Sequence, residues 1–118
     1  MSADRIAELR PAIREAIDGA PNTCVTFEID GDSDKWLQFV DHTINAAYPH
    51  IEDPSHRIEA MSGVAIPRIV DWEAGEFATF ELARVELTPL AKWIDEYFVS
   101  ILGCDAGGYH FSIVFQTI

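Results

Sequence analysis

Three histidines near the middle of the chain are the first residues whose types suggest chemistry. His42, His50 and His56 are spread over one short stretch, with Glu52 and Asp53 between them. Imidazole and carboxylate groups bind zinc, but zinc ligands usually sit in pairs on a tight turn or one helical turn apart. These spacings show neither pattern. We therefore interpret the five residues as solvated polar groups of loops and expect no metal site and no cofactor. A small metal-binding protein or enzyme built on this region is the alternative.

Alternating carboxylates in Asp30-Gly-Asp-Ser-Asp34 resemble the beginning of a calcium-binding loop. An EF-hand loop would next need a glycine and later a glutamate, at positions where this chain has Lys35 and Asp41. It would also need helices on both sides, whereas the flanking residues alternate as strands do. The stretch is therefore predicted to be an acidic hairpin turn.

No catalytic residue is assigned. The chain contains no G-x-S-x-G sequence and no glycine-rich phosphate loop. Glu73 and Glu76 flank a predicted turn, and Asp95 and Glu96 fall off the apolar face of a predicted helix. Carboxylates at such positions are usually solvated, so we expect all four to be surface residues and the protein not to be an enzyme.

Size and charge restrict the remaining function classes. The chain has 118 residues, which fits one globular domain over residues 1–118. Its formal net charge of -12 repels phosphate backbones and anionic lipid surfaces, so nucleic acid and membranes are not expected as partners. No signal peptide or membrane-spanning run is recognised. Cys24 and Cys104 lie far apart in the chain and are expected to be reduced thiols in a cytoplasmic protein.

Hydrophobic periodicity predicts an α+β fold. Apolar residues recur at helical or alternating spacing in the order α-β-β-β-α-β-β-α-β, without a regular strand–helix–strand repeat. We therefore expect a mainly antiparallel sheet with the helices packed on one face. Helices are predicted at 2–18, 54–61 and 88–103, and strands at 23–30, 36–40, 43–48, 68–73, 76–83 and 109–116.

The stretch from Thr88 to Gly103 is the clearest predicted helix. Thr88 is the expected N-cap, Pro89 suits the first helical position, and Gly103 can adopt the left-handed conformation that ends a helix. Pro11 should kink the first helix or delay its beginning. The sheet residues expected to contact the long helix are Val25, Phe27, Ile29, Phe111, Ile113 and Phe115.

Aromatic residues are more numerous than one helix-on-sheet layer obviously needs, and this surplus provides the candidate binding site. Most of them should form the core. The alternative is that some of them line an exposed groove or a dimer face. On this basis we assign a candidate binding surface to Trp36, Gln38, Tyr48 and Trp72.

The element order resembles that of bacterial type III secretion chaperones and the related YbjN-like peptide-binding domains. The matching elements are a helix, a meander over 23–48, a short helix over 54–61, a hairpin over 68–83 and a long helix over 88–103. No residue motif matches, so no functional residue is transferred. The resemblance implies a chaperone-like dimer that binds an extended segment of another protein.

Three functions are compatible with these features. The first is a non-enzymatic protein- or peptide-binding module whose partner is a basic or unfolded polypeptide. The second is an acidic immunity protein that neutralises a basic toxin, since its negative charge would steer the association. The third is the metal protein or enzyme of the His42/His50/His56 region.

Overall fold

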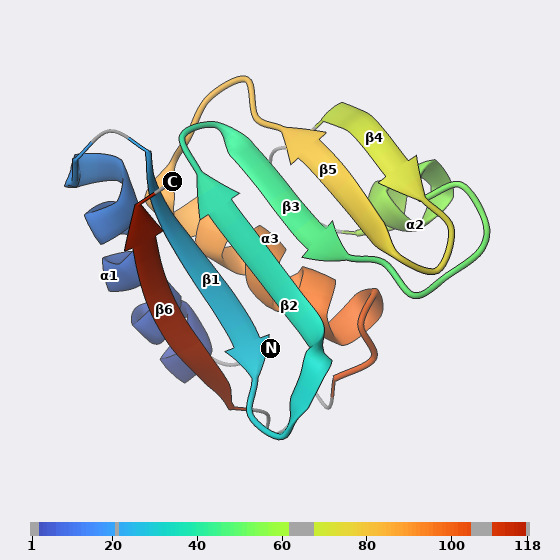
Figure 1. Ribbon diagram of the computed structural model, residues 1–118, viewed down its shortest axis with the longest axis horizontal. Coiled ribbons are helices and arrows are strands. Elements are labelled where there is room, and N and C mark those ends of the chain that lie inside the picture. Colours follow the sequence, from blue (N-terminus) through green and yellow to red (C-terminus); the bar gives the residue numbers. More distant parts are fainter. Residues whose placement is uncertain (1–2, 21, 62–67, 105–109, 118) are drawn as a thin grey trace.

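The chain folds into one antiparallel sheet whose helices lie on a single face (Figure 1). The computed structural model describes residues 3–20, 22–61, 68–104 and 110–117. Within them the order α-β-β-β-α-β-β-α-β and the α+β class are confirmed. The elements are α1 Ala3–Asp18, β1 Thr23–Ile29, β2 Asp32–Val40, β3 Thr43–Ala47, α2 Ser55–Glu59, β4 Arg68–Glu73, β5 Phe77–Glu81, α3 Leu87–Ser100 and β6 Phe111–Thr117.

The six described strands follow the order β4-β5-β3-β2-β1-β6. Strands β1, β2 and β3 form the predicted meander, in which Val25 lies opposite Phe39 and Phe39 lies opposite Ile44. The last strand returns to the beginning of the chain, where Phe27 pairs with Ile113. This pairing leaves β4 and β6 as the two edges of the sheet.

Side-chain alternation sends one apolar set from each strand toward the helices. Phe27, Leu37 and Ala46 occupy one row across β1, β2 and β3, and all three are fully buried. The predicted contact between the long helix and the last strand is present, because Phe98 of α3 stacks on Phe111 with ring centroids 6.1 Å apart. Nearer the beginning of α3, the Trp93 ring meets the Phe80 ring of β5 edge to face. Aromatic side chains from the helices and from the sheet therefore pack together in the core, as expected for most of them.

The helix ends differ in part from the predictions. Helix α3 begins at Leu87 with Glu86 as its N-cap, so the N-cap assigned to Thr88 is wrong by two residues. Pro89 is tolerated because the amides of a first helical turn have no intrahelical partner. Gly103 has φ 76°, and the amide of Cys104 donates to the Phe98 carbonyl at 2.9 Å, so the predicted glycine stop is confirmed. Helix α1 runs through Pro11, so the predicted late beginning is wrong.

Other boundaries shift by a few residues. Strand β2 begins at Asp32, so the acidic turn is shorter than predicted and centres on Gly31, which has φ 81°. Asp41 has φ 55° in the turn that joins the strands predicted at 36–40 and 43–48. The first residue of the last predicted strand, at position 109, and the first residue of the first predicted helix, at position 2, lie outside the described residues.

Asp95 corrects the prediction that the carboxylates of the long helix are solvated. Its exposed fraction is 1%, and Oδ1 lies 2.7 Å from Nε of Arg5 in α1. Arg5 is itself buried, so this ion pair joins the two long helices within the protein interior. The apolar pattern of α3 did not predict the burial of Asp95, because the partner of Asp95, Arg5, lies near the other end of the chain.

Candidate functional site

The face of the sheet opposite the helices is the candidate site. In Figure 1, α1, α2 and α3 all lie behind the sheet, and no described element crosses its front. We call this front the open face. Its side chains are those that alternate with the buried rows, so Trp36 and Gln38 lie on it because Leu37 and Phe39 lie in the core.

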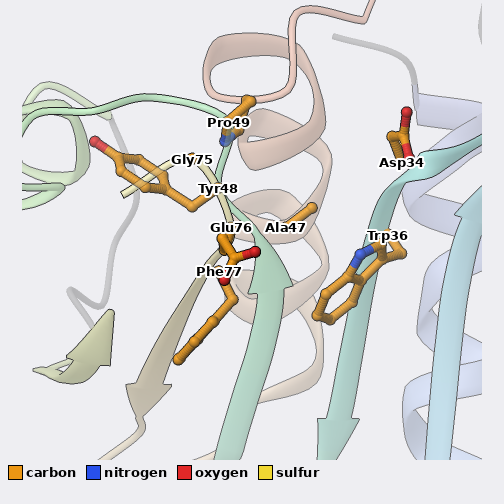
Figure 2. A pocket seen from close by; sticks show the side chains of 8 residues that line it. All are labelled: Asp34, Trp36, Ala47, Tyr48, Pro49, Gly75, Glu76 and Phe77. Atoms are coloured by element: carbon orange, nitrogen blue, oxygen red, sulfur yellow. The ribbon is translucent and has the colours of Figure 1, made fainter. Parts of the chain in front are cut away.

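A groove of about 650 Å³ lies at one end of the open face. Its walls come from the beginning of β2, the end of β3 and the turn between β4 and β5, as Figure 2 shows. The lining residues are Asp34, Trp36, Ala47, Tyr48, Pro49, Gly75, Glu76 and Phe77.

One row of side chains explains the shape of the groove. Trp36 on β2 and Phe77 on β5 stand on either side of β3, where Ala47 provides only a methyl group. Both aromatic side chains are half-buried, whereas Ala47 is 4% exposed. The small residue between two large ones leaves a space with two aromatic walls.

Hydrogen bonds from α3 and between neighbouring backbone segments fix the floor of this groove. The Tyr97 hydroxyl of α3 donates to the Ala47 carbonyl at 2.8 Å. The amide of Tyr48 donates to the Glu76 carbonyl at 3.0 Å, and the amide of Gly75 donates to the His50 carbonyl at 2.8 Å. Burial raises the pKa of Tyr97 far above its ordinary value, so the phenol stays protonated and remains a donor. The floor is thus a fixed part of the fold.

Carboxylates continue the aromatic row at both ends. Glu28 lies opposite Trp36 on β1, and Glu73 lies opposite Phe77 on β4. Asp34 and Glu76 belong to the groove lining itself. Across the described strands, the one basic side chain aligned with this face is Arg68, and it already pairs with Glu81 at 2.7 Å. The groove is therefore an aromatic site within an acidic surface.

A polar row follows next to the aromatic one. Gln38 lies between Thr26 and Asn45 on the neighbouring strands, and Asn45 lies opposite Thr79. The Thr79 hydroxyl donates to Oδ1 of Asn45 at 3.1 Å. These side chains offer amide and hydroxyl groups beside the groove, where they could bond to the backbone or polar side chains of a ligand.

The structure separates the four predicted binding residues into two pairs. Trp36 and Gln38 lie on the open face. Tyr48 and Trp72 lie on the opposite, helix-covered face of the sheet, where their rings meet edge to face with centroids 6.3 Å apart. Trp72 pairs with the buried Ala78, and the fully buried Tyr48 donates from its hydroxyl to the Glu52 carbonyl at 2.7 Å. In Figure 2 the Tyr48 ring points away from Trp36 and Phe77, so Tyr48 borders the groove without presenting its ring to it.

Phe77 is the main groove residue that sequence reasoning did not select. It stands in a strand whose alternation was recognised, at a position opposite in phase to the buried Ala78 and Phe80. That phase shows that Phe77 faces away from the helices. Trp36 and Phe77 face the same groove because β3 lies between β2 and β5, and this strand order cannot be predicted from local periodicity.

The histidines do not form one site. His42 and His50 lie at opposite ends of β3, and Nε2 of His50 lies 2.8 Å from the Ile101 carbonyl, which can only accept a hydrogen bond. Among residues 3–20, 22–61, 68–104 and 110–117, no three histidine, cysteine, aspartate or glutamate side chains are grouped to hold a metal ion. Cys24 and Cys104 are both free thiols.

No protein-family model matches the chain, and no curated protein or solved structure is significantly similar to it. Among the described helices, none combines the length and the apolar character needed to span a membrane. The candidate site therefore has to be interpreted from its own geometry and charge.

Proposed function

We propose that the protein is a non-enzymatic binding module that holds a basic segment of another polypeptide on its open face. The observation that carries the proposal is the row Glu28, Trp36, Ala47, Phe77 and Glu73, in which two aromatic walls lie between carboxylates. Aromatic faces attract cations, and a surrounding negative potential strengthens the attraction. Neither feature alone selects a ligand, but together they favour a positively charged side chain with an apolar stem.

An arginine or lysine side chain fits both parts of the groove. Its methylene stem would lie over Ala47 between Trp36 and Phe77, and its charged end would reach Asp34 or Glu76 at the rim. Arginine is the better occupant because its flat guanidinium stacks on aromatic rings and pairs with carboxylates through two bonds. Gln38 and Asn45 would accept or donate hydrogen bonds along the next part of the segment.

The chaperone-like character suggested by the element order belongs to the same proposal. A wide open face suits an extended segment better than a compact ligand, because successive side chains of the segment can reach successive rows of the sheet. The net charge of -12 supports a basic segment, since long-range attraction would speed the encounter. An immunity protein that blocks a basic toxin would use the same charge, but the groove adds a pocket for a single side chain.

A titration with a defined peptide tests the proposal. The peptide alternates arginine and leucine over about eight residues, and a matched peptide has glutamate at each arginine position. We expect saturable binding of the arginine peptide in calorimetry, with the glutamate peptide not binding. Trp36→Ala should weaken binding about 5- to 30-fold, since stacked aromatic contacts with cations are worth roughly 1 to 2 kcal/mol.

A control variant separates groove binding from general stickiness. Ile51 is 80% exposed and lies outside the groove, so Ile51→Ala removes exposed apolar surface without touching the site. It should bind the arginine peptide as the unmodified protein does. Equal loss in Trp36→Ala and Ile51→Ala, or equal binding of both peptides, would reject the groove as the binding site.

A further inference from the structure

The aromatic row of the open face has carboxylates at equal distances from its centre. Glu28 lies opposite Trp36, and Glu73 lies opposite Phe77, which also pairs with Ala47. In the sheet order β4-β5-β3-β2-β1, Ala47 of β3 is therefore two strands from Glu73 and two strands from Glu28. Neighbouring strands lie about 4.8 Å apart, so each carboxylate position is about 9.6 Å from the centre of the groove.

This spacing restricts the conformation that a bound segment can adopt. Side chains on one face of a β-strand recur at every second residue, about 6.8 Å and then about 13.6 Å along the segment. Side chains on one face of a polyproline II helix recur at every third residue, about 9.3 Å apart. An α-helix comes near the spacing only after seven residues, at about 10.5 Å. The polyproline II conformation therefore matches the two carboxylates most closely.

We propose that the basic segment adopts a polyproline II conformation, lies across the strands and carries a basic residue at every third position. This inference rests on the proposed function, because its central basic residue is the one held in the groove between Trp36 and Phe77. The two outer basic residues then extend toward Glu28 and Glu73. Among the described residues, no ion pair uses either carboxylate, so both can pair with a ligand.

The open face presents side chains, and not backbone groups, to a ligand. The backbone groups of β1, β2, β3 and β5 are directed at neighbouring strands within the sheet. A segment lying across this face therefore keeps its own backbone in water, as a polyproline II helix does. Grooves lined by aromatic residues bind such helices in other proteins, and prolines fix the conformation before binding, which lowers the entropy cost.

The polar row beside the groove complements the backbone of a proline-rich segment. Proline has a backbone carbonyl but no N–H, so such a segment offers more acceptors than donors. Oδ1 of Asn45 accepts from the Thr79 hydroxyl, which leaves Nδ2 of Asn45 to donate. The side-chain amide of Gln38, opposite Asn45, can donate in the same way. Residues between the basic ones can therefore bond to this row.

Two peptides of identical composition test the spacing. Arg-Pro-Pro-Arg-Pro-Pro-Arg places its arginines on one face about 9.3 Å apart, whereas Pro-Arg-Pro-Arg-Pro-Arg-Pro places them on different faces. We expect the first peptide to bind about tenfold more tightly in calorimetry, because only this peptide gains both outer charge contacts. The double variant Glu28→Gln with Glu73→Gln should remove this preference.

A matched double variant on the helices serves as the control. Glu8→Gln with Glu59→Gln removes the same charge from exposed residues outside the groove lining, so it should keep the preference for the first peptide. Equal affinity of the unmodified protein for both peptides, or an unchanged preference in the Glu28 and Glu73 variant, would overturn the spacing. If both peptides bind equally and Trp36→Ala weakens both, the groove is right and the spacing alone is wrong. If neither peptide binds, both proposals are wrong.

Discussion

Nε of Arg5 lies 2.7 Å from Oδ1 of Asp95, and the two residues are 90 positions apart in the chain. Both side chains are more than nine-tenths buried. The pair therefore ties α1 to α3 inside the protein, on the side of the sheet opposite the groove. Because α3 also carries Tyr97, which bonds to the groove floor, this ion pair supports the helix on which the site rests.

Asp95→Asn should destabilise the protein by about 3 kcal/mol, because it leaves the Arg5 charge buried without its ionic partner. The double variant Arg5→Met with Asp95→Leu should lose less, since no isolated charge remains. Urea unfolding measures the free energy of unfolding of both variants. Arg68→Ala breaks an ion pair of similar length whose side chains are 72% and 52% exposed, so it should cost less than about 1 kcal/mol. Equal losses in Asp95→Asn and Arg68→Ala would contradict the structural role assigned to the buried pair.

Tyr97→Phe should remove one source of instability at high pH. Burial raises the pKa of Tyr97 in the folded protein, so its contribution to stability is complete below the pKa of an unfolded tyrosine, about 10, and declines above it. At neutral pH the variant should lose about 1 kcal/mol with the hydrogen bond to Ala47. Urea midpoints from pH 8 to pH 11 should therefore fall more steeply for the unmodified protein. Parallel curves would show that Tyr97 ionises normally in the fold.

Carboxylates at the rim should control the salt dependence of ligand binding. The double variant Asp34→Asn with Glu76→Gln should weaken the arginine peptide about tenfold at low salt and flatten the dependence on ionic strength. Glu8 and Glu59 are exposed on α1 and α2, so Glu8→Gln with Glu59→Gln removes the same charge from residues outside the groove lining. Calorimetry at two salt concentrations compares the affinity of the two double variants for the arginine peptide. If both double variants behave alike, net charge and not the rim determines affinity.

Thiol reagents should react slowly with the folded protein. Burial is the main cause that raises the pKa of both Cys24 and Cys104, and the thiolate is the reactive form. Cys104 is half-buried whereas Cys24 is 2% exposed, so Cys104 should be modified first. Mass spectrometry after timed labelling at pH 8 shows the order in which the two thiols are modified. Labelling of the unfolded protein in urea should be fast at both cysteines. Faster modification of Cys24 would show that its strand opens readily.

The candidate site was predictable only in part. Trp36 and Gln38 could be placed away from the helices because each alternates with a recognisable core residue. Trp72 and Tyr48 also alternate with their neighbours, but alternation alone did not show which face of the sheet their rings occupy. The structure places both rings on the helix-covered face, where they meet edge to face. Phe77 was overlooked because its importance comes from a neighbour two strands away.

The sequence by itself determined the elements, their order and the face that the helices cover. Those features follow from short-range spacing, since period 2 and period 3.6 identify strands, helices and their apolar sides. The tertiary structure alone decided the strand order, the burial of Asp95 beside Arg5, and the groove between Trp36 and Phe77. Each of these joins residues from separate elements. Such contacts depend on how whole elements pack together, which local side-chain patterns do not specify.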